Sequence, residues 1–318
     1  MLSTTSHRPS QWLLVDAGNT RTKLGLFDAV PPVTGKLPVC TRVWILENSE
    51  PPDWALLQSA ATAFTELRLC LAGSNPRRVE ELLRLLPDHW PQPVLLPERS
   101  AFPLRMRVDF PEKVGIDRLL NAIAANQLRR AGQAAVVVSS GTATTVDYVA
   151  PDGSFCGGAI LPGFELSARA LHEYTALLPL IPLDVVLQEP PDELGRNTEA
   201  ALRSGLYWGH VGAVRELVRR FMHRATSDQQ TSDQQKSGLQ SPAQQTAARQ
   251  SGGDVRGRHL GNITAAERPL VLLTGGAAPL LQSHLPSLVH SEPQLALQGL
   301  ALLCGTMDDS GNPAATSR

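Results

Sequence analysis

The sequence predicts an α/β protein built from two related halves, and two observations carry this prediction. The first is an alternation of short apolar runs, typical of strands, with segments whose apolar residues recur at helical spacing. The second is a pair of similar hairpins, at residues 13–27 and 134–149. In each hairpin an apolar strand enters a small polar turn, D-A-G in the first and S-S-G in the second. This repetition favours a duplicated fold in which each half contributes one phosphate-binding turn.

The composition limits the classes of protein that fit. The 318 residues suit two domains of ordinary size, and 42% apolar residues are typical of a globular chain. With 29 basic and 30 acidic residues the charge is nearly balanced, so we expect no nucleic-acid partner. No apolar run approaches the roughly eighteen residues that a membrane span needs, and residues 1–12 hold no signal-peptide core. We therefore expect a cytoplasmic protein with no membrane partner.

The cysteines and histidines give no sign of a metal site. Cys40, Cys70, Cys156 and Cys304 are widely spaced and form no C-x-x-C pair. Neither a disulfide framework nor a zinc site is therefore indicated, and a reducing compartment is expected. The eight histidines are also scattered.

The first half opens with polar residues 1–11, which we expect to be a disordered extension, followed by the first hairpin. Its turn carries Gly18, Asn19 and Thr20, which favour a tight turn whose N–H groups can hold phosphate oxygens. Asp16 beside it could hold a phosphate-bound Mg²⁺. A plain surface hairpin is the alternative interpretation. The remaining pattern predicts strands at 42–46 and 67–74 and helices at 54–66 and 77–86.

Residues 115–118, with the sequence G-I-D-R, precede a helical stripe of apolar residues. They should therefore lie at a helix N-terminus, where the helix dipole and free N–H groups attract anions. Arg118 can pair with a carboxylate or phosphate there, and Asp117 can accept a proton. An acidic residue in a first helical turn also has a plain structural interpretation, because it suits the dipole. We expect the first domain to span residues 12–132.

The second domain is expected at residues 133–318. After the second hairpin the pattern predicts a turn at 152–153, a glycine-rich segment at 157–163, a helix at 166–171, a loop at 177–188, a helix from 199, a second long helix after it, a buried strand from 269 and a helix at 295–303. Ala201, Gly205 and Gly209 would let another backbone pack close to the helix from 199. Residues 226–268 are rich in Gln, Ser, Thr and Gly, which predicts a disordered insertion.

Six motifs, taken in order, resemble those of type III pantothenate kinases. They are D-x-G-N-T-x-x-K at 16–23, G-x-D-R at 115–118, G-T-A-T-T-x-D at 141–147, G-G-x-I-x-P-G at 157–163, G-x-N-T-x-x-A-x-x-S-G at 195–205 and T-G-G at 274–276. The resemblance covers nearly the whole chain apart from its two ends and the Gln/Ser-rich segment. It implies the duplicated actin-like (ribonuclease H-like) kinase fold, with a mixed five-stranded sheet in each domain and a nucleotide cleft between the domains.

The resemblance also implies an activity. This is the ATP-dependent phosphorylation of pantothenate to 4'-phosphopantothenate, the first step of coenzyme A biosynthesis, carried out by a homodimer with Mg²⁺ and a monovalent cation, K⁺ or NH₄⁺. The residues implied to bind ATP are Asp16, Ala17, Gly18, Asn19, Thr20, Arg21, Thr22, Lys23 and Thr142. Those implied to bind pantothenate are Gly115, Ile116, Asp117, Arg118 and Thr198, the last of these from a neighbouring region of the dimeric pocket.

Ordinary phosphoryl-transfer chemistry suggests roles for three of these residues. Asp117 is the candidate base for the primary hydroxyl of pantothenate, and Arg118 would hold an anionic group beside it. Asp16 would position Mg²⁺ through the water shell of the ion.

Ser139 departs from the family pattern, because members of the family usually carry an aspartate there that helps bind the monovalent cation. A hydroxyl offers an oxygen ligand without the charge, so cation affinity should fall and the dependence on K⁺ stays open. The tyrosine that some members carry upstream of G-x-D-R is also absent, with Val108 near that position.

Two alternatives remain at the level of sequence. One is a kinase-like accessory factor that has lost activity, which Ser139 and the long insertion would support. The other is a kinase or phosphatase of the same fold acting on a sugar, acetate or polyphosphate. Retention of Asp16, Asp117 and Arg118 argues against the first, and the G-x-D-R and G-x-N-T segments argue against the second.

Overall fold

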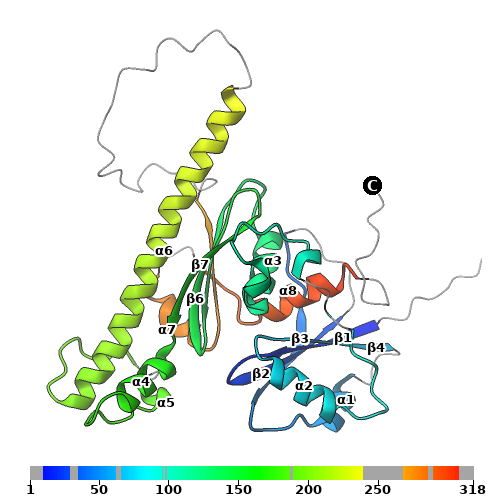
Figure 1. The fold of residues 1–318 in the computed structure, drawn as a ribbon, viewed down its shortest axis with the longest axis horizontal. Coiled ribbons are helices and arrows are strands. Elements are labelled where there is room, and N and C mark those ends of the chain that lie inside the picture. The colour runs from blue at the N-terminus through cyan, green and yellow to red at the C-terminus, as the bar shows by residue number, and fades with distance from the viewer. Residues whose placement is uncertain are drawn as a thin grey trace, which may run out of the picture.

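A computed structural model of the chain describes residues 10–28, 35–61, 66–94, 96, 99–186, 189–238, 268–285 and 289–307. Two sheets lie on either side of a layer that contains the helices α3 and α8 (Figure 1).

The first sheet has the strand order β3-β2-β1-β4. Its strands are β1 (Ser10–Ala17), β2 (Arg21–Asp28), β3 (Cys40–Glu47) and β4 (Glu66–Ala72). The predicted hairpin is confirmed, because β1 and β2 pair antiparallel, whereas β1 and β4 run parallel. The first strand begins at Ser10, so the expected extension over 1–11 is two residues too long, and residues 1–9 lie outside the described part of the chain.

The expectation of five strands in this sheet is corrected, since the described residues form four. A single parallel bridge between Cys70 of β4 and Val94 stands where a fifth strand would pair. Alternation along β1 divides its side chains between two cores. Leu13 and Val15 pack with α1 (Trp54–Ala61), while Trp12 and Leu14 face the central layer. The helix α2 (Pro76–Leu85) contacts β1.

The second sheet repeats the topology of the first, with the order β7-β6-β5-β8-β9. Its strands are β5 (Ala135–Ser140), β6 (Ala143–Val149), β7 (Phe155–Pro162), β8 (Leu270–Thr274) and β9 (Val289–Ser291). A hairpin, a third antiparallel strand and a parallel partner for the first strand recur in the same order. The duplication predicted from the two hairpins is therefore confirmed.

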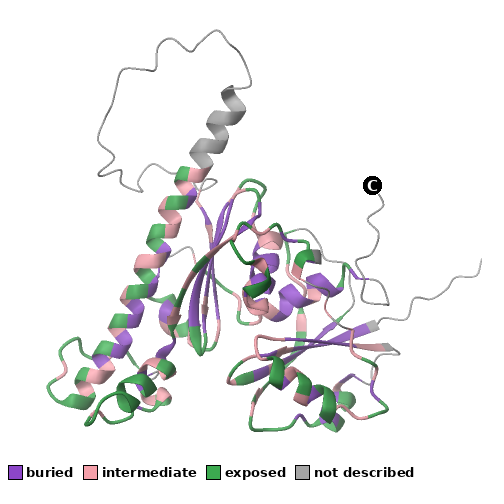
Figure 2. Cartoon of the chain, viewed as in Figure 1, coloured by how far each residue is buried: buried purple, intermediate pink, exposed green. Residues whose placement is uncertain are grey.

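The central layer joins the two sheets. It contains α3 (Ile116–Leu128) and α8 (Leu295–Cys304), whose buried leucines share one core with β1 and β5 (Figure 2). Gly299 of α8 lies against the α3 backbone, and a Cβ there would stand 2.0 Å from the Leu120 carbonyl oxygen. Close packing of the two helices therefore requires glycine at this position.

The helices of the second half differ most from expectation. The helix α4 (Phe164–Glu173) is slightly longer than predicted, and α5 (Leu183–Val186) lies inside the segment expected to be loop. The predicted pair of helices after residue 199 is one continuous helix, α6 (Thr198–Gly238). Short helices η1 (Arg99–Ala101) and η2 (Pro111–Lys113) and helix α7 (Ala278–Gln282) complete the described elements.

The predicted insertion begins too early, because residues 226–238 continue α6, and residues 239–267 lie outside the described part of the chain. Extending a formed helix is far easier than nucleating one, so polar residues with fair helical propensity can follow. A tertiary contact supports the extension, since the Tyr148 hydroxyl of β6 donates to Asp228 Oδ2 at 2.9 Å. In the described residues, no helix has the length and apolar character needed to cross a bilayer.

Candidate functional site

The two predicted turns face one another across the junction of the two halves. Thr20 Oγ1, in the β1–β2 turn, lies 2.8 Å from Thr142 Oγ1, in the β5–β6 turn. Arg21 also approaches the T-G-G turn, with its guanidinium 3.8 Å from a Cβ placed on Gly276. The structure therefore brings together the two segments that the sequence assigned to phosphate binding.

Asn48, which sequence reasoning missed, holds the first turn in shape. Its Nδ2 donates to the carbonyl oxygens of Gly18 and Asn19, both at 2.9 Å, and its Oδ1 accepts from Thr22 Oγ1 at 2.9 Å. With these carbonyls engaged, the turn is fixed before any ligand arrives. The sequence offered one signal for this role, an asparagine directly after a strand. Asparagine is common in turns, so its position alone does not indicate such a contact.

Asp16 is the last residue but one of β1, opposite Lys23 of β2. Its Oδ1 is buried and has no hydrogen-bond partner among the described residues. Burial raises the pKa of this carboxyl to about 6, the negative charge of Asp117 adds to the rise, and Lys23 opposes it. A buried carboxylate oxygen without a partner is a suitable ligand for a hard cation, so this residue fits the expected Mg²⁺ position.

Asp117 lies in the first turn of α3, whose N-cap is Gly115 and whose first residue is Ile116. Its carboxylate folds back over the chain, so that a Cβ on Gly115 would meet Asp117 Oδ1 at 2.6 Å. The Asp117 charge raises the pKa of both Asp16 and Asp147. The predicted base thus lies at a helix N-terminus, within electrostatic reach of two other carboxyl groups.

Arg118 is paired within the protein. Its Nε lies 3.0 and 3.2 Å from Oδ1 and Oδ2 of Asp147, and its Nη2 donates to Oδ1. Asp147 is almost fully buried and also accepts from Thr145 Oγ1 at 3.0 Å. Burial raises the pKa of Asp147, whereas the ion pair with Arg118 lowers it. Sequence reasoning quoted Asp147 as the last letter of a motif but gave it no role.

Glycine at position 158 makes room for this ion pair. A Cβ there would lie 2.5 Å from Asp147 Oδ1 and 2.1 Å from the Val146 carbonyl oxygen. In the glycine-rich 157–163 segment, the backbone at Gly158 therefore approaches the carboxylate that Arg118 binds, as only a residue without a Cβ can.

Thr198 and Ser139 come from elements other than those that carry Asp16, Asp117 and Asp147. Thr198 is exposed at the start of α6, where Asn197 Oδ1 accepts the Ala200 N–H at 2.8 Å. This end of α6 contacts α4 and α5, away from the β1–β2 turn (Figure 1). Ser139 is half-buried on β5, paired with Thr145 and Thr274 of the neighbouring strands. Among the described residues, no group of three or more His, Cys, Asp or Glu side chains could hold a metal.

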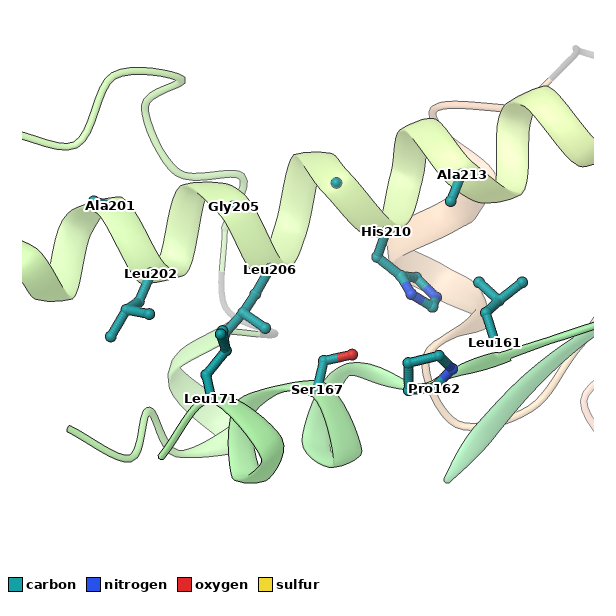
Figure 3. A pocket seen from close by; sticks show the side chains of 11 residues that line it. Leu161, Pro162, Ser167, Leu171, Ala201, Leu202, Gly205, Leu206, His210 and Ala213 are labelled. Atoms are coloured by element: carbon teal, nitrogen blue, oxygen red, sulfur yellow. The ribbon is translucent and has the colours of Figure 1, made fainter. Parts of the chain in front are cut away.

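A separate apolar pocket of about 330 Å³ lies between α6, α4 and the end of β7 (Figure 3). His210 points into it from α6 and is its only imidazole. The lining residues are Leu161, Pro162, Ser167, Leu171, Ala201, Leu202, Gly205, Leu206, Gly209, His210 and Ala213.

Two halves with one strand order, each presenting a hairpin turn to the other, define an actin-like, two-domain α/β protein. The chain belongs to the type III pantothenate kinase family, whose sequence model matches residues 12–220. The resemblance found in the six motifs is thereby confirmed.

Two relatives match over nearly their whole length. A type III pantothenate kinase of Ruegeria sp. (strain TM1040) is 37% identical over 310 residues, which cover 95% of this chain and 99% of the relative. The type III pantothenate kinase of Saccharopolyspora erythraea is 32% identical and covers 92% and 97%. A solved archaeal actin homologue is 10% identical, covers 91% of this chain and 98% of its own, and has a TM-score of 0.38.

Proposed function

We propose that this protein transfers the γ-phosphoryl group of ATP to the primary hydroxyl of pantothenate and so forms 4'-phosphopantothenate, the first intermediate of coenzyme A biosynthesis. One observation carries the proposal: two preformed turns meet at the junction of the halves, with the unpartnered carboxylate of Asp16 beside the first of them. Family membership supplies the substrate, because the family and its members are named for pantothenate.

The protein aligns the γ-phosphate of ATP with the pantothenate hydroxyl, and it accepts the proton of that hydroxyl. The two turns bind the phosphates of ATP through their N–H and hydroxyl groups. Asp117 accepts the proton of the pantothenate hydroxyl while that oxygen attacks the γ-phosphorus and ADP leaves. Asp16 would hold Mg²⁺, which supplies charge neutralisation to the phosphates when bound.

Arg118 acts from a fixed position in this mechanism. Two of its nitrogens are engaged by Asp147, so the guanidinium is held rigidly next to the predicted base. We assign it an electrostatic role toward the anionic transition state. For the monovalent cation we propose reduced affinity, because Ser139 offers a neutral hydroxyl where the family resemblance implies a carboxylate.

The proposed assembly is a homodimer formed through α6. Ala201, Gly205, Gly209 and Ala213 recur every four residues and so share one face of the helix. A Cβ on Gly205 or Gly209 would meet no atom within 4 Å, so this face is open in a single chain. Exposed apolar side chains lie on the same part of the second half, namely Leu171, Tyr174, Leu177 and Leu194. A second copy would cover them, and it would bring Thr198 into the pocket of its partner.

The decisive experiment is an ADP-release assay with Mg-ATP and K⁺, run with and without pantothenate, and with mass detection of phosphopantothenate. Pantothenate-dependent product supports the proposal. ATP binding without product would favour the accessory-factor alternative, and product from a sugar or acetate would favour another kinase of the fold. Because ATP is the donor, the proposed location is the cytoplasm.

A further inference from the structure

A buried chain of hydrogen bonds leads from α6 to the second phosphate turn. His210 Nε2 lies 3.2 Å from Thr144 Oγ1, and Thr144 Oγ1 lies 3.1 Å from Ser140 Oγ. Thr144 and Ser140 are fully buried, and His210 is 8% exposed. Breaking a hydrogen bond between buried polar groups costs free energy, because the remaining group cannot form a hydrogen bond to water instead.

Ser140 is the point where both glycine turns of the second half meet. It ends β5, and Gly141 and Thr142 follow it directly. Its carbonyl oxygen accepts the N–H of Ala277 at 3.1 Å, from the segment after the T-G-G turn. Gly275 has φ +95° and lies so close that a Cβ would stand 2.3 Å from the same carbonyl oxygen. A shift of Ser140 would therefore move both turns at once.

We propose that His210 is a positioning residue for ATP, acting through Thr144 and Ser140 on the two glycine turns of the second half. His210 touches neither ATP nor pantothenate in this scheme. It holds the Thr144 hydroxyl in place by a hydrogen bond, and Thr144 in turn holds the Ser140 side chain. The position of Ser140 then determines where Thr142 and the T-G-G backbone lie. The inference rests on the proposed function in assigning these turns to ATP.

The surroundings of His210 favour this role over that of an ordinary core side chain. The ring packs on Phe164 of α4, with centroids 4.2 Å apart, so its orientation is fixed. Burial lowers the pKa of His210 to about 4, so the imidazole is neutral at physiological pH and has one donor and one acceptor nitrogen. A phenylalanine would satisfy the packing equally well, whereas the contact with Thr144 requires a polar ring.

The test removes the hydrogen bond between His210 and Thr144 while keeping the volume of the aromatic ring. His210→Phe is expected to raise the Kd for a non-hydrolysable ATP analogue with Mg²⁺ by about five- to tenfold, the effect of losing one buried hydrogen bond. In turnover assays the KM for ATP should rise in parallel while the KM for pantothenate stays constant. His210→Gln, whose amide can still reach Thr144, should restore most of the affinity. Thr144→Val should reproduce the loss, and combining it with His210→Phe should add little.

The matched control is His284→Phe, which removes the hydrogen bond from another ring to α6, at 2.9 Å from the Tyr207 hydroxyl. It should leave ATP affinity unchanged. The proposal is overturned if His210→Phe binds the analogue as the parent protein does, or if His210→Gln is no better than His210→Phe at equal thermal stability. If His210→Phe does not fold, Thr144→Val decides alone by the same criterion. Analogue binding needs no pantothenate, so failure of this inference is distinguishable from failure of the kinase proposal.

Discussion

At the scale of single residues, the proposed base Asp117 is the group on which we expect turnover to depend. Replacing it with asparagine keeps the shape of the side chain and removes the proton acceptor, so we expect kcat to fall about 10²–10⁴-fold. ATP affinity should change little, because Asp117 lies on α3 and not on the turns. Turnover and calorimetric binding of the ATP analogue measure the two effects separately. Near-normal turnover of Asp117→Asn would rule out the base assignment.

The ionised Asp16 carboxylate is expected to lower the stability of the folded protein while it provides a ligand for Mg²⁺. Its folded pKa of about 6 lies above the ordinary value of 3.8 for an aspartate, so the folded state binds more protons between these values and stability falls as pH rises through them. At pH 7.5 the ionised carboxylate costs on the order of 3 kcal/mol, a cost that Asp16→Asn removes. We expect the variant to melt higher than the parent at pH 7.5, with the gap narrowing to about half at pH 5 and closing only below pH 3.8.

The same substitution should weaken Mg²⁺-dependent ATP binding, since an amide is a poorer ligand for Mg²⁺ than a carboxylate. Scanning fluorimetry at the two pH values and calorimetry with Mg-ATP analogue check both halves of the prediction. A variant that is less stable than the parent at pH 7.5 would mean that Asp16 is satisfied in the folded protein.

Substitutions at Ser139 test the proposed dependence of the reaction rate on a monovalent cation. Ser139→Asp restores a charged oxygen ligand, so the K⁺ concentration for half-maximal rate should fall severalfold. A Na⁺ titration and Ser139→Asn, which adds bulk without charge, serve as controls. An unchanged K⁺ curve would place the cation elsewhere or exclude one.

Residue types in short motifs were predictable, and their long-range partners were not. Asp16, Gly18 and Thr142 stand out because turn and phosphate chemistry restrict which residues can serve there. Asn48 and Asp147 act through side chains far away in sequence, and such contacts leave no local pattern.

At the scale of elements, α6 carries the proposed dimer contact. Gly209→Leu should leave the helix intact, because leucine favours a helix by about 1 kcal/mol over glycine. Its side chain would fill the open face and keep a second backbone away. We expect sedimentation to shift from dimer to monomer, with turnover reduced because Thr198 of the second copy is lost. The control is Arg84→Leu, which places a leucine at an exposed position of α2, and this variant should remain dimeric.

Most strands were predictable as elements, whereas β7, β9 and the long helix were not. Apolar runs bounded by glycine or polar turns mark β1, β2, β5, β6 and β8 unambiguously. In α6, four glycines and a polar second half weaken the local signal, yet Tyr207, Val211, Val214 and Val218 are buried against the second sheet. Tertiary burial outweighs propensity here, and no window of the sequence contains that information.

At the scale of the whole molecule, the two halves share a core, and this predicts a single unfolding transition. Gly299 lies where α8 crosses α3, and both helices pack between the two sheets. Gly299→Ala would force the helices apart and should cost about 1–3 kcal/mol. Since α8 contacts β1 while α3 contacts β5 and β6, the loss should lower one common melting transition. Gly305→Ala, whose Cβ meets ordinary contacts at 3.4 Å, should be nearly neutral. Calorimetry that resolves two transitions, of which only one responds to Gly299→Ala, would show that the halves unfold independently.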